Sequence, residues 1–588
     1  MKTRKFSTLI AIVAIASAAL PYGVAAQQPA PSPSPPLLPV EAPLPSAARI
    51  PTPEPSPVEP AALPEVAKGY NAPQVRPTAA NIVGVTQQPF VGLSLDDAIG
   101  MALLKNPDLA IAASNTRIAT YQVRAARGAY DVNFQVEPSY KRVTTPALNT
   151  FFSGGANTFT PIIQNYQQLS AGVQGQTSNG GTYNVSIAQE KVNDNTFVNS
   201  YNPYYFTNLN VSLTQPLLKG TYSQARHQID LSVVNSAFTT AQTLGSVSTT
   251  ISTVEDAYWD LVAAWRNVAI QEDALHQTIL QQQSNVRQAT RGYAAPIDAV
   301  ESSAQVATFQ GNVFSALQTV SQLQNQLKSV ILADPGDPIW RANLVPTTPV
   351  LELPASPEID ALIASARKNR PEVAQAAATQ RQADVNMSYS KNQLKPEVNL
   401  QLQYQGNGFA GNPLPPLGGI FGTATPPPYT VGKYGKAYGN IGQFPTYQAG
   451  VVITQPIGNN TARADYAAAQ EQERIARLDT LNVDQRIEFE ARDAVQAYQA
   501  SLARLYSARQ AREAAQAVYA SELRKFQRGA STTFLVNQRQ ITLVQNEGTE
   551  LQAQADLNKA VVELQRVDGS ILTVNNVNLT TLGSGAPK

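Results

Sequence analysis

Two stretches of 68 residues that contain no proline, residues 224–291 and 461–528, place the strongest limit on the fold. Both are rich in Ala and Gln rather than Leu, and both keep a helical pattern throughout. Because an α-helix rises about 1.5 Å per residue, each would be roughly 100 Å long. A compact globular domain has no room for such helices, so the sequence predicts an extended, mostly α-helical chain.

Each long stretch ends at a short turn that contains glycine, Arg291-Gly292 in one and Arg528-Gly529 in the other. Glycine readily adopts the left-handed backbone conformation that closes a helix, and Pro296 suits the first turn of the next helix. Shorter helices are predicted to follow at residues 296–332 and 533–566. The chain is therefore predicted to contain two helical hairpins, each made of a long and a shorter antiparallel helix.

The two predicted hairpins belong to a longer internal duplication. Pro107 and Pro371 are 264 residues apart, as are Tyr140 and Tyr404 (371 − 107 and 404 − 140). The turns of the two hairpins are 237 residues apart (529 − 292). Since solenoid repeats are far shorter, we predict two structural repeats, each with a helix, strands, a long helix and a shorter helix. The predicted repeats span residues 93–355 and 356–572.

Both repeats are predicted to begin with a helix of about 35 residues. In the first repeat Ser94 can cap this helix, and Asp97 follows three positions later, which is the pattern of a capping box. In the second repeat Ser356-Pro357-Glu358 takes the same place, and proline is tolerated in the first helical turn.

The ends of the chain are predicted to lie outside the repeats. Residues 1–26 are typical of a secretory signal peptide, and their apolar run falls short of the ~20 residues of a spanning helix, the alternative being a membrane anchor. Residues 27–92 are rich in Pro, Ala and Ser, which predicts a disordered tether, with a cell-wall contact as the alternative. Residues 573–588 form a predicted C-terminal tail.

Several segments alternate apolar and uncharged polar residues, as strands with two different faces do. Such alternation over about nine or ten residues, with aromatic residues near the strand ends, is typical of membrane β-barrels. A soluble β-sandwich also alternates, but the long loops at residues 144–168 and 406–444 favour a barrel. The predicted strands are residues 133–141, 206–214, 397–405 and 447–454, with an additional hairpin at residues 171–188 around Ser178-Asn179-Gly180-Gly181.

Composition and motifs argue against several other classes of protein. The chain has no cysteine, which excludes disulfides and thiolate metal sites, and its net charge of +1 gives no reason to expect a nucleic-acid partner. His227 and His276 lie far apart on one long helix, and the sequence contains no phosphate-binding loop or nucleophile motif. We therefore predict that the protein is not an enzyme and binds no metal or cofactor.

The signal peptide, the duplication, the Ser94-Leu95-Asp96-Asp97 helix start and the Arg-Gly turns together resemble the TolC-like outer-membrane efflux proteins (outer membrane factors). Thr214-Gln215-Pro216 at a strand end, repeated as Thr454-Gln455-Pro456, belongs to the same pattern. The resemblance covers residues 93–572 and implies a homotrimer in the outer membrane of a diderm bacterium. In that family three chains share one β-barrel, which continues into a periplasmic α-helical barrel of twelve helices.

The resemblance also implies a function, the exit channel of a tripartite efflux or type I secretion system. Such a channel is a passive duct that contacts outer-membrane lipid and docks to a periplasmic adaptor and an inner-membrane pump or exporter. The candidate docking tips are Arg291, Gly292, Arg528 and Gly529. A structural coiled-coil envelope protein or adhesin without channel activity is the alternative.

The additional hairpin departs from the family pattern of two membrane strands per repeat, or twelve per trimer. If the hairpin joins the barrel, a trimer has eighteen strands; if it stands above the membrane, twelve remain. The sequence does not decide between these arrangements, and we favour twelve.

A second departure concerns the periplasmic end, which in the family is narrowed by acidic residues of the second hairpin. The 237-residue spacing aligns Asp298 with Leu535 and Glu301 with Gln538, so here the acids lie in the first hairpin. These two acids share a helix face, and in a trimer they would form rings that attract cations. Alternatively they are solvated carboxylates at a helix start, where the helix dipole favours them. The side chains predicted to link one hairpin to its neighbour are Tyr293, Phe526 and Arg528.

Overall fold

The computed structural model describes residues 89–148, 153, 159–196, 198–293, 295–349, 358–415 and 425–577. All of them belong to one compact unit, residues 66–588. The predicted signal peptide, residues 27–88 of the Pro-rich segment, the Ser356-Pro357 helix start and residues 578–588 of the tail lie outside the described residues.

The described elements follow one another in two series of similar order. The first series is β1 (Phe90–Leu93), α1 (Leu95–Lys105), α2 (Pro107–Arg127), η1 (Gly128–Tyr130), β2 (Asn133–Thr145), β3 (Ile162–Gln176), β4 (Thr182–Asp194), β5 (Tyr201–Pro216), α3 (Gln224–Thr290), α4 (Pro296–Ile331), η2 (Pro338–Arg341) and β6 (Asn343–Pro346). The second is α5 (Ile359–Asn369), α6 (Pro371–Gln393), β7 (Glu397–Pro413), η4 (Pro428–Thr430), α7 (Tyr434–Gly439), β8 (Phe444–Thr454), α8 (Asn460–Gln527), α9 (Thr533–Val567) and α10 (Ile571–Val574).

The prediction of one long helix before the strands of each repeat is wrong, because each of these helices is broken in two. The breaks fall at Asn106, before Pro107, and at Arg370, before Pro371. A proline pushes the residue before it out of the helical conformation. The Asn106 side chain caps the second helix by accepting from the backbone N–H of Asp108 at 2.8 Å and of Leu109 at 3.1 Å.

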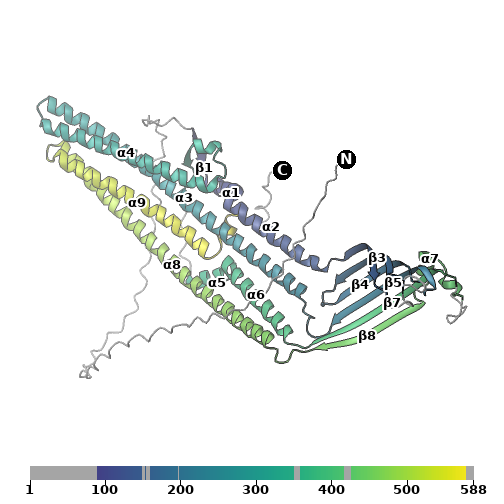
Figure 1. Cartoon of the computed structure of the whole chain (residues 1–588). Coiled ribbons are helices and arrows are strands. Elements are labelled where there is room, and N and C mark those ends of the chain that lie inside the picture. Colours follow the sequence, from purple (N-terminus) through teal and green to yellow (C-terminus); the bar gives the residue numbers. More distant parts are fainter. Residues whose placement is uncertain are drawn as a thin grey trace, which may run out of the picture. The chain divides into compact units, whose positions relative to one another are not determined.

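The long helices α3 and α8 contain 67 and 68 residues, and the returning helices α4 and α9 contain 36 and 35. Near the sheet, α3 contacts α2 and α6, and α6 contacts α8; further away, α3 contacts α4 and α9, and α9 contacts α8 (Figure 1). The shorter helices therefore follow one another along the long ones, α4 after α2 and α9 after α6. The result is a wall one helix thick, in the order α2/α4, α3, α6/α9, α8.

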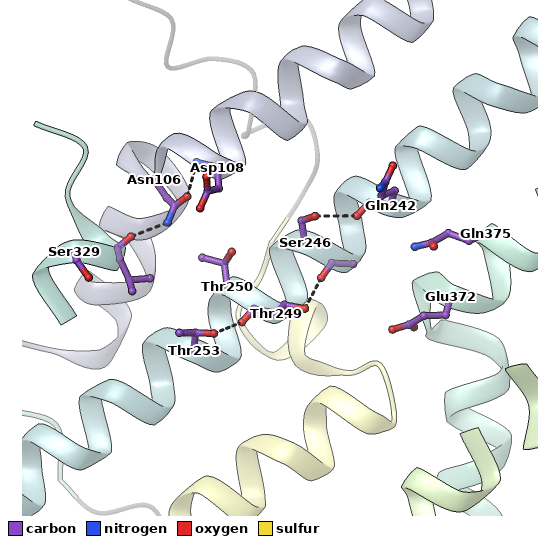
Figure 2. Close-up of a pocket in the computed structure, with 12 residues that line it drawn as sticks. Asn106, Asp108, Gln242, Ser246, Thr249, Thr250, Thr253, Ser329, Glu372 and Gln375 are labelled. Carbon is purple, nitrogen blue, oxygen red and sulfur yellow. Dashed lines mark hydrogen bonds between the residues drawn. The ribbon is translucent and has the colours of Figure 1, made fainter. Parts of the chain in front are cut away.

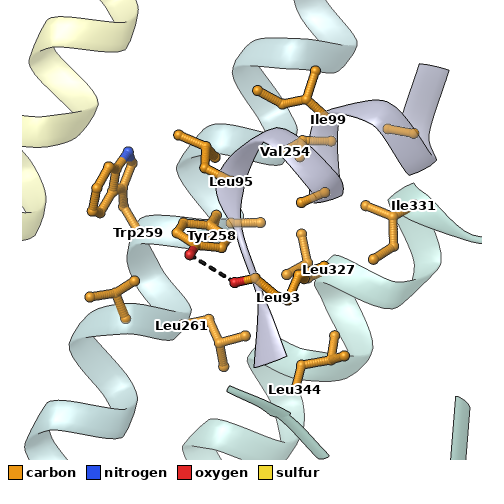
Figure 3. Packing of buried hydrophobic residues seen from close by; sticks show 14 of the residues in the cluster. Leu93, Leu95, Ile99, Val254, Tyr258, Trp259, Leu261, Leu327, Ile331 and Leu344 are labelled. Atoms are coloured by element: carbon orange, nitrogen blue, oxygen red, sulfur yellow. Dashed lines mark hydrogen bonds between the residues drawn. The ribbon is translucent and has the colours of Figure 1, made fainter. Parts of the chain in front are cut away.

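The main apolar core lies halfway along this wall, where α1, α3, α4, β1 and β6 meet (Figure 3). The Tyr258 hydroxyl donates to the Leu93 carbonyl at 3.0 Å, and β1 pairs in parallel with β6. Tyr258 and Trp259 are almost fully buried, and burying such a side chain contributes on the order of 2–3 kcal/mol. Because Phe90–Leu93 form β1, the prediction that residues 89–92 belong to the disordered extension is wrong.

The described strands β2 to β8, leaving β6 aside, form one antiparallel six-stranded sheet in the order β2-β3-β4-β5-β7-β8. The additional hairpin, β3 and β4, lies inside this sheet with 15 and 13 residues. One chain does not test the favoured count of twelve strands per trimer. The strands are also longer than predicted. Residues 162–168 and 406–413, predicted to be loop, continue β3 and β7 because backbone ladders do not require alternating side chains.

Candidate functional site

One face of the sheet is apolar along rows of paired residues that cross every strand. The row that starts at Phe134 is apolar throughout, and the row two residues further holds only apolar residues and glycine. The first row is Phe134, Val173, Val185, Val211, Tyr404 and Tyr447, and the second is Val136, Ala171, Ile187, Leu209, Gly406 and Pro445. On the two edge strands Phe134 is 70% exposed and Tyr447 76% exposed. Contact with lipid suits such a face.

The opposite face carries uncharged hydrogen-bonding side chains. The row between the two apolar rows is Gln135, Gly172, Ser186, Asn210, Gln405 and Thr446. Neighbouring amides on this face bond to one another: Gln403 donates to Asn210 at 2.8 Å, and Asn208 donates to Asn407 at 2.7 Å. These amides form a polar surface suited to water, as the alternating sequence pattern predicted.

The end of the sheet away from the long helices is rich in aromatic residues. Here α7, which the sequence did not predict, lies against the apolar face of β5 and β7 (Figure 1). The Thr207 hydroxyl donates to the Ala437 carbonyl at 2.8 Å, and the Tyr205 and Tyr434 rings are 4.7 Å apart. A Cβ atom at Gly408 would lie 2.0 Å from the same carbonyl, so this close approach requires glycine.

The two hairpin tips have the same backbone geometry. Gly292 and Gly529 adopt φ of 75° and 73°. The N–H of each glycine, and the N–H of the residue after it, donate to carbonyls of the last helical turn at 2.9–3.0 Å. This pair of hydrogen bonds defines a Schellman motif, which the left-handed conformation of the glycine makes possible. Arg291 and Arg528 are the C-cap residues and lie exposed.

The predicted gate residues lie at or near the hairpin tips, and within the described part of one chain the charged ones among them form no ion pairs. The Asp298 carboxylate accepts the backbone N–H of Ala295 at 3.2 Å, which is a helix-start role, while Glu301 is exposed. Tyr293 is 84% exposed, Leu535 is 37% exposed, Arg528 and Gln538 are exposed and Phe526 is half-buried. Within the described residues, none of Asp298, Glu301 and Arg528 forms an ion pair. The acidic rings remain a prediction.

Instead, buried polar residues that the sequence analysis did not single out connect the two hairpins near the tips. Asn285 of α3 donates to Ser302 of α4 at 2.5 Å and lies 3.5 Å from the Thr533 hydroxyl of α9. Gln540 of α9 donates to the Thr278 hydroxyl of α3 at 3.0 Å. The signal in the sequence is a polar residue at a position where helical spacing expects an apolar one.

Two further buried groups lie between helices, one in each hairpin. Glu550 of α9 is 2% exposed and accepts from Nε of Arg509 at 3.2 Å and of Arg512 at 2.5 Å, both on α8. Glu255 of α3 is 4% exposed and accepts from the Asn575 amide at 3.1 Å. The pKa of Glu255 is raised to about 7, and burial is the largest cause. The hydrogen bond from Asn575 lowers this pKa, and the nearby Asp256 and Asp96 carboxylates add to its rise.

An open polar groove of about 600 Å³ lies between α2, α3, α4 and α6 (Figure 2). Its hydroxyls bond to their own helix: Thr249 donates to the Gly245 carbonyl at 3.0 Å and Thr253 to the Thr249 carbonyl at 2.9 Å. The Asn106 amide donates to the Val330 carbonyl at 2.8 Å. Because these groups are engaged by backbone rather than directed at a shared point, the groove does not define a ligand site.

Among the described residues, no helix combines the length and the apolar character needed to cross a membrane. The same residues contain no cluster of three or more His, Cys, Asp or Glu side chains placed to hold a metal ion.

Comparisons with known proteins agree with this arrangement. Residues 362–570 match the family described as "Outer membrane efflux protein". Among solved structures, the chain is similar to the CmeC outer membrane channel of Campylobacter jejuni, with 13% identity over 83% of this chain and 90% of that one and a TM-score of 0.56. It is also similar to the open state of the MtrE outer membrane channel of Neisseria gonorrhoeae, with 16% identity over 81% and 88% and a TM-score of 0.53.

A third similar structure is the outer-membrane channel OprN, with 15% identity over 86% of this chain and 98% of that one and a TM-score of 0.54. No curated protein matches the chain. Over residues 362–570 the match supports the family predicted from the sequence, the TolC-like outer-membrane efflux proteins. The predicted location in the outer membrane, with a periplasmic helical part, agrees with the description of the similar structures as outer membrane channels. The similar structures are channels with a helical barrel and a β domain, and the chain has this fold.

Proposed function

We propose that the chain is a passive exit duct of a tripartite efflux or type I secretion system. The observation that carries this proposal is the continuity of two surfaces within one chain. A sheet with an apolar face and an amide-lined face leads directly into a wall of long helices one layer thick. A wall one helix thick leaves two broad faces of the chain uncovered, and several copies of it can enclose water.

A homotrimer satisfies the open edges of the sheet. Strands β2 and β8 each have one unpaired side, and unpaired backbone groups in a bilayer cost several kcal/mol each. Closure with further copies pairs them all. Three copies of the four-helix wall then give twelve helices, in agreement with the helical barrel that the sequence resemblance implied.

The chain is proposed to contain two structural repeats, residues 93–355 and 356–572. The similar order and lengths of the two element series support this, as do the matching glycine tips. The repeats differ in the sheet, to which the first contributes four strands and the second two.

The tips around Gly292 and Gly529 are proposed to dock a periplasmic adaptor, and through it an inner-membrane pump or exporter that supplies the energy. Both tips are exposed, and both long helices of the chain reach them. Among the described residues no cluster of side chains is placed to hold a metal ion, and the polar groove beside α3 does not define a ligand site, so neither feature favours an enzyme. A structural envelope rod is less well supported. It does not account for a sheet with one apolar face and one amide-lined face, which suits a barrel wall between lipid and water.

Light scattering on detergent-extracted protein tests the assembly. We expect the mass of a trimer. A stable monomer that retains its β-structure by circular dichroism contradicts the proposal, because its sheet edges would then be tolerated without partners.

A further inference from the structure

The sheet of one chain has the geometry of one third of a closed barrel. We propose that three copies close an eighteen-stranded β-barrel in which β8 of one copy pairs with β2 of the next. This inference rests on the proposed trimeric duct and adds the strand count, the joining edges and their register. The partner is therefore a second copy of this chain, bound through two specific strand edges.

The direction of the strands permits this closure. Every neighbouring pair in the sheet is antiparallel. With six strands in the sheet, the first and last edges, β2 and β8, run in opposite directions, so a β8–β2 contact between copies is antiparallel as well. The hairpin β3–β4 preserves this relation because it adds strands in a pair.

The edges of the helical wall agree with those of the sheet. Helix α2 leads into β2, and β8 leads into α8. These two helices form the outer sides of the wall near the sheet. The sheet and the helical wall therefore have their unpaired edges on the same two sides of the chain. One rotation between copies can then close the sheet and the wall together.

The strand ends nearest the helices form a staircase, as the tilted strands of a barrel require. The row of paired residues that starts at Asn133, the first residue of β2, reaches Gln448 on β8, while β8 itself ends at Thr454. The stagger accumulated by one chain is therefore six residues (454 − 448). Because these strand ends belong at one membrane surface, Thr454 should lie level with Asn133 of the next copy.

This stagger gives a physically reasonable barrel. Three chains accumulate a stagger equal to their number of strands, which corresponds to a strand tilt of roughly 35° for a rise of about 3.3 Å per residue and a strand spacing of about 4.8 Å. Membrane barrels tilt their strands by about 35–45°. The backbone diameter is then about one and a half times that of a twelve-stranded barrel with the same tilt.

The joined register also matches the faces of the two edge strands. With Thr454 opposite Asn133, Val136 lies opposite Val451 and Tyr140 opposite Tyr447. Val136 is 51% exposed and Val451 56% exposed in one chain, and Tyr140 is 64% exposed. An even stagger keeps apolar residues on one face, whereas an odd stagger would place them against amides.

Cysteine cross-linking tests the edge and the register, because the natural chain contains no cysteine. In the double variant Val136→Cys with Val451→Cys, mild oxidation or a short bis-thiol reagent should join copies covalently into dimers and closed trimers. The matched control, Val136→Cys with Tyr447→Cys, moves one thiol four residues or about 13 Å along β8 and should not join copies. Stronger joining in the control pair than in the test pair overturns the proposed register.

The strand count has its own test. Val136 and Leu209 lie in the same row but are separated by β3 and β4. Val136→Cys with Leu209→Cys should therefore not cross-link within a chain, whereas a twelve-stranded barrel that excludes the hairpin would bring these strands together. Electron microscopy of the wild-type trimer in lipid nanodiscs should show eighteen strands. A conducting trimer with twelve overturns this inference and leaves the proposed function standing; a monomer without channels overturns the proposed function itself.

Discussion

The two helical hairpins have nearly equal lengths and the same tip geometry, but different interiors. Around α3 and α4 the core is aromatic, with Trp259 and Tyr258 fully buried. Alanine is the most frequent buried residue of α8, and the charged Arg509 and Glu550 lie between α8 and α9. Length and tips must match if both hairpins reach one partner, whereas an interior only has to be filled with satisfied groups.

The largest expected effect comes from removing the buried ion pairs between α8 and α9 in the second hairpin. Glu550→Ala leaves the buried Arg509 and the partly buried Arg512 without this carboxylate, and breaking a buried pair in this way costs about 3–5 kcal/mol. The thermal unfolding midpoint of the solubilised trimer should fall clearly. Glu513→Ala is the matched control, since Glu513 also faces Arg512 but is 60% exposed, and such pairs contribute about 0–1 kcal/mol. Equal shifts in the two variants contradict the account.

The second prediction uses the buried acid of the first hairpin. The pKa of Glu255 is about 7 in the folded chain against 4.5 as its ordinary value. Between these values the folded state holds a proton that the unfolded state has lost, so the contribution of Glu255 to stability is greatest below pH 4.5 and falls as the pH rises to 7. In Glu255→Gln the fall in thermal midpoint from pH 5 to pH 7 should shrink.

Burial also raises the pKa of the neighbouring Asp256 to about 6, so the variant keeps part of the slope. Glu513→Gln, at an exposed position, should retain the whole wild-type slope. A pH profile of Glu255→Gln identical to that of the wild type means that Glu255 is ionised in the folded chain throughout this range.

The third prediction tests what the hairpins share. Gly292→Val and Gly529→Val force a branched residue into the left-handed conformation at a cost of roughly 1–2 kcal/mol, although a Cβ would meet no atom within 4 Å. We expect lower export at unchanged trimer yield. Asn tolerates this conformation, so Gly529→Asn should retain most export. Gly311→Val, at an ordinary position of α4 with similar free space, is the control. Wild-type export by both tip valine variants would exclude the tips from docking.

The smallest expected effect concerns the two acids at the tip of the first hairpin, which have no acidic counterparts in the second hairpin. Asp298→Asn with Glu301→Gln keeps a side-chain oxygen at position 298 to accept the Ala295 N–H, so folding should be unchanged. Reversal potentials in a salt gradient should show a modest loss of cation selectivity, because the acidic rings are gone. Unchanged selectivity would identify both acids as solvated helix-start residues, and the constriction would then lie among Phe526, Arg528, Leu535 and Gln538.

Helices were easier to predict than strands. The predicted helix at 224–291 is observed at Gln224–Thr290, and that at 461–528 at Asn460–Gln527, because glycine caps and the absence of proline are local signals. Strand β3 was predicted from residue 171 but begins at Ile162, where both faces carry polar residues and alternation gives no signal. The parallel pairing of β1 with β6 depends on contacts between residues far apart in sequence, which no local pattern reports.

The tips could be predicted for the same reason as the helix ends, since Arg-Gly marks a Schellman motif in sequence. The buried bonds of Asn285 and Glu550 could not, because their partners lie on other helices. The candidate gate residues Asp298 and Glu301 were predicted by alignment of the two repeats, and one chain shows only their positions at the helix start.

Single-channel recording in a planar lipid bilayer tests the central claim most directly. Purified wild-type trimer, without any pump or adaptor, should insert and give discrete conductance steps, because the duct is formed by this chain alone. The Gly529→Val variant should give steps as well, since its defect is in docking and not in the duct. Trimers that incorporate into lipid but conduct no ions under any voltage or salt condition would contradict the account and favour a structural envelope protein.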